Sequence, residues 1–328
     1  MEKITEVRVA DPQFVVRAAR NRMRRSILAP DGKLNILAAD HPARRVLKVG
    51  DDPVRMADRH GYLARIVRVL KSDLVDGVMA TMDLLEDLLI LHTLIKDAGG
   101  PGLLDNKLLL VSLNRGGLAA SSWELDDPIT GPSATSSTSL NLDGAKLLLR
   151  LCDEEPSSLK TLLDCARAIT EMNAVGLPTF LEPLPVVKSD GGYKVVKTAN
   201  ELAKIVGVAS ALGDSSRHLW LKLPYCEGYE RVAGATNLPI LLLGGESVGD
   251  AMPLLREISC GLSARSNVRG ALVGRNVLYP GSEDPLVVAQ AAGFIIHNGW
   301  TIEHAFESAQ SWRSKDLNIM VEKLGLSA

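Results

Sequence analysis

A lysine stands in the middle of an apolar run in the last third of the chain. In "HLWLKLPYCEG", residues 218–228, three leucines alternate with Trp220, Lys222 and Pro224, as in a buried strand. A buried ammonium costs several kcal/mol unless it is paired or gives up its proton. A neutral amine can condense with a ketone, and the resulting iminium withdraws electrons from a neighbouring carbon–carbon bond. We interpret Lys222 as a candidate Schiff-base nucleophile; the alternative is a structural ion pair.

Other ionisable side chains lie in or at the end of the predicted apolar strands, and those that could act together with Lys222 are Lys146, Glu182 and Asp40. Charged groups on the inward faces of such strands must compensate one another. A second lysine close to Lys222 would lower the pKa of Lys222 toward the operating pH. Glu182 could move the protons that imine chemistry requires. We therefore predict that these four side chains meet in one cluster.

Two glycine motifs follow the last two predicted strands. "LLLGGES" contains Gly244, Gly245 and Ser247, and "GALVGRN" contains Gly274 and Arg275. Glycines let the backbone approach an anion closely, and an arginine adds charge-assisted hydrogen bonds. Parallel barrels often hold a phosphate at this pair of strands. The motifs predict a phosphate site, and tight turns without a ligand are the alternative.

Short apolar runs alternate with helical patterns along the chain, which predicts strands that are buried on both faces. The predicted strands are 34–40, 76–81, 107–113, 145–151, 178–184, 218–224, 239–245 and 269–275. Eight such units predict an α/β fold, the (β/α)8 TIM barrel. An open doubly wound sheet is the competing architecture, although no Gly-x-Gly-x-x-Gly follows the first strand.

Two further segments complete the predicted architecture. We expect an N-terminal helix within residues 12–25, placed to close the bottom of the barrel. The polar stretch 116–141, after the third strand, is too long for an ordinary connection and is either an active-site cover or disordered. No linker is evident, so we expect a single domain over residues 1–328.

The composition of the chain argues against several classes of function. The chain has 328 residues, of which 46% are hydrophobic, and a formal net charge of -2. Such a balance argues against nucleic acid as a partner. The N-terminus lacks a signal-peptide pattern, and the most apolar stretch is too short and too charged to span a bilayer. The four cysteines show no metal-like spacing, so we expect reduced thiols in a cytoplasmic protein, without a membrane partner or a metal.

The motifs together resemble class I, Schiff-base-forming aldolases of the (β/α)8 superfamily. "LAADHPARR", "GAKLLLRLCDEEP", "PTFLEPLPV", "LWLKLPY" and "GALVGRNVLYPGSEDP" resemble the motifs of the tagatose-1,6-bisphosphate and sulfofructose-phosphate aldolase group in the same order. This resemblance implies that Lys222 is the nucleophile, Glu182 transfers protons, and Lys146 tunes Lys222 and contacts substrate. It also implies that Asp40 holds a substrate hydroxyl or the carbinolamine, without any cofactor. The "DHPARR" form and the insertion at 116–141 depart from the family pattern.

The chain is also similar to an actinobacterial-type aldolase group associated with inositol breakdown. This similarity implies 6-phospho-5-dehydro-2-deoxygluconate as substrate, cleaved to dihydroxyacetone phosphate and malonate semialdehyde. The substrate carboxylate needs cationic partners, and the candidates are Arg44, Arg45, Arg115 and Arg150; the alternative for each is a solvated charge. His41 is a candidate for binding a substrate oxygen.

The motifs leave alternative functions open. They are a deoxyribose-phosphate aldolase or transaldolase-like activity, and a non-catalytic barrel that binds sugar phosphates. For all of them we expect a small sugar phosphate as the ligand and a homo-oligomer as the assembly.

Overall fold

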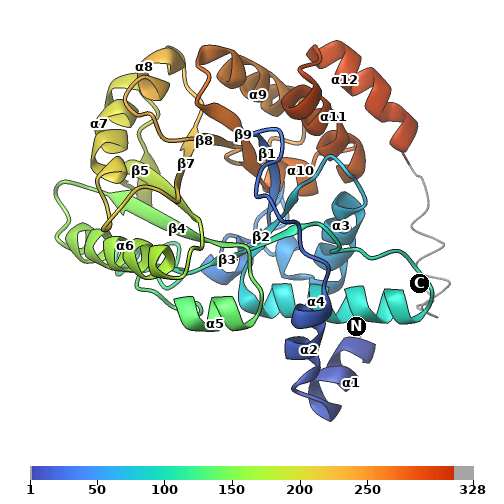
Figure 1. Ribbon diagram of the computed structural model, residues 1–328. Coiled ribbons are helices and arrows are strands. Elements are labelled where there is room, and N and C mark those ends of the chain that lie inside the picture. Colours follow the sequence, from blue (N-terminus) through green and yellow to red (C-terminus); the bar gives the residue numbers. More distant parts are fainter. Residues whose placement is uncertain (1, 314–328) are drawn as a thin grey trace.

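Eight parallel strands form a closed barrel in the computed structural model (Figure 1). β1 pairs with β2 and β9, and β4 pairs with β5, which completes the ring. The strands are β1 (Leu34–Ala38), β2 (Gly77–Ala80), β3 (Leu108–Ser112), β4 (Gly144–Leu151), β5 (Thr179–Ser189), β7 (Leu219–Pro224), β8 (Ile240–Leu243) and β9 (Val268–Val273). The structure describes residues 2–313; residues 1 and 314–328, which the single-domain prediction also covers, lie outside the described residues.

This topology confirms the predicted (β/α)8 barrel. An open doubly wound sheet has two edge strands, whereas the β4–β5 pairing closes the ring of parallel strands. Every predicted strand is present, with ends that differ by a few residues. β1 stops at Ala38, so Asp40 lies just beyond it, and β5 continues past the predicted end to Ser189.

Helices surround the barrel because each buries one apolar stripe against the strands. α9, for example, buries Leu254, Leu255 and Ile258 on one face. The helices are α1 (Glu2–Ala10), α2 (Phe14–Asn21), α3 (Arg59–Leu70), α4 (Met82–Asp97), α5 (Ala134–Ser139), α6 (Ser157–Ala174), α7 (Ala199–Ser210), α8 (Tyr229–Ala233), α9 (Met252–Ala264), α10 (Arg275–Leu278), α11 (Pro285–Asn298) and α12 (Ile302–Ala309). Among residues 2–313, none of these helices combines the length and apolarity that crossing a bilayer would need.

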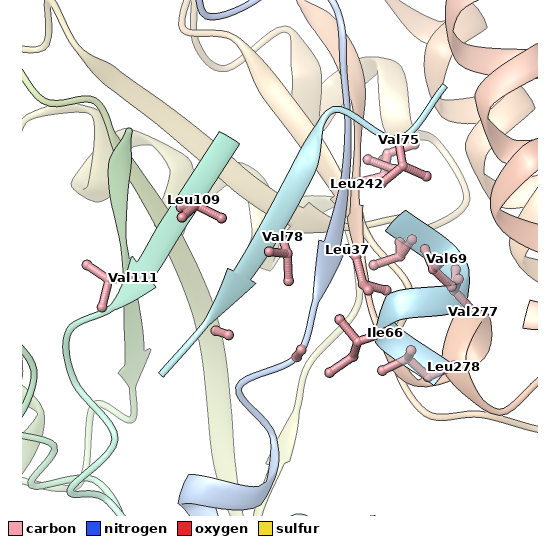
Figure 2. Close-up of a cluster of buried hydrophobic side chains, with 14 of the residues drawn as sticks. Leu37, Ile66, Val69, Val75, Val78, Leu109, Val111, Leu242, Val277 and Leu278 are labelled. Atoms are coloured by element: carbon pink, nitrogen blue, oxygen red, sulfur yellow. The ribbon is translucent and has the colours of Figure 1, made fainter. Parts of the chain in front are cut away.

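Alternate residues of each strand face the two sides of the barrel wall. On β1, Leu34 and Ile36 belong to a small apolar cluster inside the barrel, whereas Leu37 belongs to the larger cluster between strands and helices. Figure 2 shows Leu37 together with Ile66 of α3 in that outer layer. The same alternation decides which ionisable residues point into the barrel.

The N-terminal segment differs from its predicted arrangement. α2 is a helix as predicted, but it packs beside α4 rather than across the barrel (Figure 1). The bottom of the barrel is covered by the chain after this helix, where Leu28 and Ala29 pack against the inner apolar cluster. Arg22 and Arg24 anchor this chain by ion pairs to Asp143, which immediately precedes β4. The arginines after the helix therefore have structural partners at the lower rim.

Two connections at the upper rim extend the walls of the barrel. The long loop after β3 contains α5 and is tied down by the buried side chain of Glu124. The end of β5 forms an antiparallel hairpin with β6 (Gly192–Val195). Sequence analysis missed this hairpin, although "SDGGYKVVK" carries a glycine-rich turn between two apolar stretches, which is a hairpin signal.

Candidate active site

A cavity of about 940 Å³ opens at the C-terminal ends of the strands. Most of the predicted site residues line it, namely Asp40, His41, Arg44, Arg115, Lys146, Arg150, Glu182, Lys222, Gly244, Gly245, Gly274 and Arg275. Ser247 does not line the cavity; its hydroxyl donates a hydrogen bond to the carbonyl of Tyr279 at 2.6 Å. The ends of six strands thus contribute ionisable groups to one space, as expected for a parallel barrel.

Lys222 lies at the floor of the cavity beside a shared carboxylate. Its Nζ donates to Oε2 of Glu182 at 2.9 Å, and Nζ of Lys146 lies 2.8 Å from the same oxygen. Lys222 is 6% exposed and Lys146 only 1%. Strand parity places all three side chains inside the barrel, since Lys146 and Lys222 face the same interior as Phe180 of β5.

Asp40 connects this cluster to the first strand. Its Oδ2 accepts a hydrogen bond from the hydroxyl of Ser112 at 2.8 Å and lies 3.6 Å from Nζ of Lys146. Nε of Arg115 lies 3.3 Å from the same oxygen, and the guanidinium also donates to the backbone carbonyl of Asp40. The structure therefore brings the four predicted catalytic residues into contact, in the order Asp40, Lys146, Glu182, Lys222.

The electrostatics of the cluster favour ionised acids and make Lys222 easier to deprotonate. Burial by itself would raise the pKa of Glu182, but the two lysines hold it well below its usual range. Asp40 behaves in the same way, with Arg115 and Lys146 lowering its pKa against the effect of burial. Burial lowers the pKa of Lys222, and the charge of Lys146 lowers it further, although Glu182 opposes the change. Less free energy is therefore needed to deprotonate Lys222 than for an ordinary lysine.

The predicted phosphate site lies beside this cluster. Gly245 has a φ of 65°, a conformation that favours glycine. A Cβ on Gly274 would lie 2.3 Å from the carbonyl oxygen of Ala38 and 2.5 Å from Cε1 of His41, so only glycine fits there. Asn276, which follows Arg275, donates a hydrogen bond from its side chain to the carbonyl of Gly244 and steadies the turn.

Two buried polar atoms on this side of the cavity have no hydrogen-bond partner within the described chain. They are Nδ1 of His41 and Nε of Arg275. Burial lowers the pKa of His41 to about 3, so its imidazole is neutral. The Arg275 guanidinium is 3.7 Å from the exposed carboxylate of Glu246. Buried polar groups without a partner are costly, and both residues line the cavity, so this region is a candidate for receiving an anion.

Most of the arginines predicted to bind a substrate carboxylate already interact with other groups of the protein. Arg44 lies 2.9 Å from Oε1 of Glu124, and Arg150 pairs with the same oxygen. Arg115 is held by Asp40, and Arg45, which has a φ of 63°, is not among the cavity-lining residues. The structure thus places two of the four arginines against a loop carboxylate at the cavity wall.

Sequence analysis missed several cavity residues that the extended rim supplies. Glu124 comes from the long loop, while Tyr193, Lys194 and Lys197 come from the β5–β6 hairpin and the chain that follows it. The turn in "SDGGYKVVK" was the available signal for the hairpin, but nothing in the sequence pattern indicates where the hairpin leans. Across the whole lining, eight lysines and arginines face five aspartates and glutamates, in a chain whose net charge is -2. The cavity therefore concentrates positive charge, which favours an anionic ligand.

Comparison with known proteins identifies the family to which the chain is similar. A family model described as Cgl0159-like matches residues 32–293. The crystal structure of Cgl0159 from Corynebacterium glutamicum is 36% identical, with a TM-score of 0.84 over 91% of this chain and 97% of that chain. The family match extends over all eight barrel strands, from β1 to β9.

More distant relatives share the barrel. An archaeal fructose 1,6-bisphosphate aldolase is 22% identical, with a TM-score of 0.59 over 87% of this chain and 100% of that chain, a likeness that bears on the fold alone. A 3-hydroxy-5-phosphonooxypentane-2,4-dione thiolase of Salmonella typhimurium is 31% identical over 88 residues, which are 27% of this chain and 28% of that protein. The chain spans less than a third of the length of the curated relatives it matches.

Proposed function

The chain belongs to the Cgl0159-like family, and from that premise we propose that it is a class I aldolase. It cleaves a phosphorylated ketose or keto-sugar acid through an imine at Lys222. The observation that carries this proposal is the sharing of one buried oxygen of Glu182 by Lys146 and Lys222 within the cavity. A structural ion pair needs only one lysine, whereas the charge of a second one beside it lowers the pKa of Lys222.

The reaction follows from the contacts around Lys222. The neutral amine adds to the substrate ketone, and loss of water from the carbinolamine forms the iminium. Glu182 exchanges the protons of these steps, and its negative charge stabilises the positive iminium. Deprotonation of the hydroxyl on the β carbon then releases an aldehyde, while the electrons of the broken carbon–carbon bond move into the iminium and form an enamine. Protonation of the α carbon and hydrolysis release the ketone and restore Lys222.

The substrate class follows from the charge of the cavity. The phosphate lies at the turns of Gly244, Gly245 and Gly274, with Arg275 as its charged partner, and Asp40 holds a substrate hydroxyl. The thiolase relative acts, by its name, on a phosphonooxy-substituted diketone, which supports a phosphorylated ketone here.

Within this class, we propose 6-phospho-5-dehydro-2-deoxygluconate as the first substrate to test. Its ketone lies next to the phosphate-bearing carbon, so one molecule can reach both Lys222 and the phosphate turns. Cleavage would give dihydroxyacetone phosphate and malonate semialdehyde. Because Glu124 already neutralises part of the charge of Arg44 and Arg150, a substrate carboxylate must share these arginines with the loop.

Borohydride reduction in the presence of dihydroxyacetone phosphate tests the proposal. The expected result is a mass increase confined to the peptide that contains Lys222, with none in the Lys222→Met variant. Lys107 is an internal control: burial lowers its pKa to about 8, but it lies just before β3, at the opposite end of the barrel. Labelling of Lys107 or no labelling at all would overturn the imine mechanism. Absence of labelling with retained binding would indicate a non-catalytic sugar-phosphate barrel instead.

A further inference from the structure

The β5–β6 hairpin brings the chain close to the turn at Gly244 and Gly245, where we place the substrate phosphate. Lys197 follows β6 directly and lines the cavity. Its Nζ lies 3.5 Å from the position that a Cβ on Gly245 would occupy. An ammonium group therefore approaches the open face of the turn at a place where Gly245 has no side chain.

Arg275 reaches the same turn. Its Nη1 lies 3.7 Å from Oε1 of Glu246, the residue that follows Gly245, and its buried Nε has no hydrogen-bond partner within the described chain. Lys197 is exposed, and within residues 2–313 no carboxylate lies within 4.0 Å of its Nζ. Two cations with only loose acidic partners, Glu246 for Arg275 and Glu257 for Lys197, thus flank one glycine turn.

This arrangement suits a phosphate group better than a neutral sugar. A phosphate monoester carries between one and two negative charges near neutral pH and offers three acceptor oxygens. Backbone N–H groups of a glycine turn satisfy part of that demand, and two cations can satisfy the rest. A neutral hydroxyl at the same place could not neutralise the charges of Lys197 and Arg275.

We propose that Lys197 is a substrate-binding residue that contacts the phosphate together with Arg275, so that the hairpin selects phosphorylated over unphosphorylated ketones. The identity of the ligand rests on the proposed function. The role of Lys197 does not depend on imine chemistry, because the residue touches the anion and not the carbonyl.

Titration of the protein with inorganic phosphate, followed by calorimetry at low ionic strength, tests this role. Lys197→Met should weaken phosphate binding roughly tenfold, the loss expected for one charge-assisted contact. Lys197→Arg should restore most of the affinity. Lys188→Met is the matched control, since Lys188 lies on the same hairpin but pairs with Glu155 and does not line the cavity; its phosphate affinity should equal that of the unmodified protein.

Two results would overturn the proposal. One is an unchanged phosphate affinity in Lys197→Met, and the other is an equal loss in Lys188→Met, which would reveal a general effect of surface charge.

Reduction with borohydride separates this inference from the proposed function. In Lys197→Met, dihydroxyacetone phosphate should still label Lys222 completely at saturation, with a half-saturating concentration raised about tenfold. Failure to label the unmodified protein would refute the imine mechanism while leaving the phosphate result intact. Equal phosphate affinities would refute the role of Lys197 while leaving the chemistry of Lys222 intact.

Discussion

Replacing Lys146 with methionine should slow imine formation at Lys222 without dismantling the site. Both lysine nitrogens lie within 2.9 Å of one oxygen of Glu182, so they are less than about 6 Å apart. Two unit charges at that separation repel each other by roughly 3 kcal/mol at an effective dielectric constant of about 20. Removing one charge raises the pKa of Lys222 and lowers the neutral fraction of its amine by up to about a hundredfold at neutral pH.

The assay is the single-turnover rate of borohydride trapping with dihydroxyacetone phosphate, measured from pH 6 to pH 10. Because the pKa of Lys222 is raised in the variant, the rate at neutral pH should fall, and the rise of rate with pH should move to a more alkaline range. Lys204→Met is the control, since Lys204 pairs with Glu201 on the surface of α7. If the profile of Lys146→Met kept its position or moved to lower pH, electrostatic tuning by Lys146 would be refuted.

The remaining predictions address the acid, the long loop and the barrel wall. Glu182→Gln removes the charge that raises the pKa of Lys222, so imine trapping should persist to lower pH than in the unmodified protein, while turnover falls by roughly a hundredfold or more. Glu124→Gln leaves the buried Arg150 and the half-buried Arg44 without their carboxylate; unfolding free energy in urea should drop by about 3 kcal/mol, and proteolysis within the loop after β3 should accelerate. Gly270→Ala should lower the free energy of unfolding by about 3 kcal/mol, because φ is 126° and a Cβ would lie 2.0 Å from a backbone oxygen of β1. Gly207→Ala, at a position in α7 with open space around it, should raise the free energy of unfolding by about 0.5 kcal/mol. Similar values for the two variants would contradict the clash at Gly270.

Strand parity made much of the site predictable from the sequence. Each apolar run marks a strand, and alternation along it decides which side chains face inward. Lys146, Glu182 and Lys222 occupy inward positions on three such runs, and Asp40 follows a fourth. Because the C-terminal ends of parallel strands meet at one rim, their residues share one space once the barrel closes.

The identity of each partner depended on the closed structure. The pairing of β4 with β5, adjacent to β7, places Lys146 and Lys222 on opposite sides of Glu182. The distances between these side chains depend on strand register and on closure of the barrel, and the sequence of a single strand does not specify either.

The sequence by itself determined the barrel, its inward-facing ionisable residues and the glycine turns, because these follow from periodicities within a few residues along the chain. Only the tertiary structure decided that Glu124 pairs with Arg44 and Arg150, and that the chain after the β5–β6 hairpin brings Lys197 to the turn at Gly245. Those contacts join segments that are distant in sequence, and the strength of an interaction between charges depends on their distance in space.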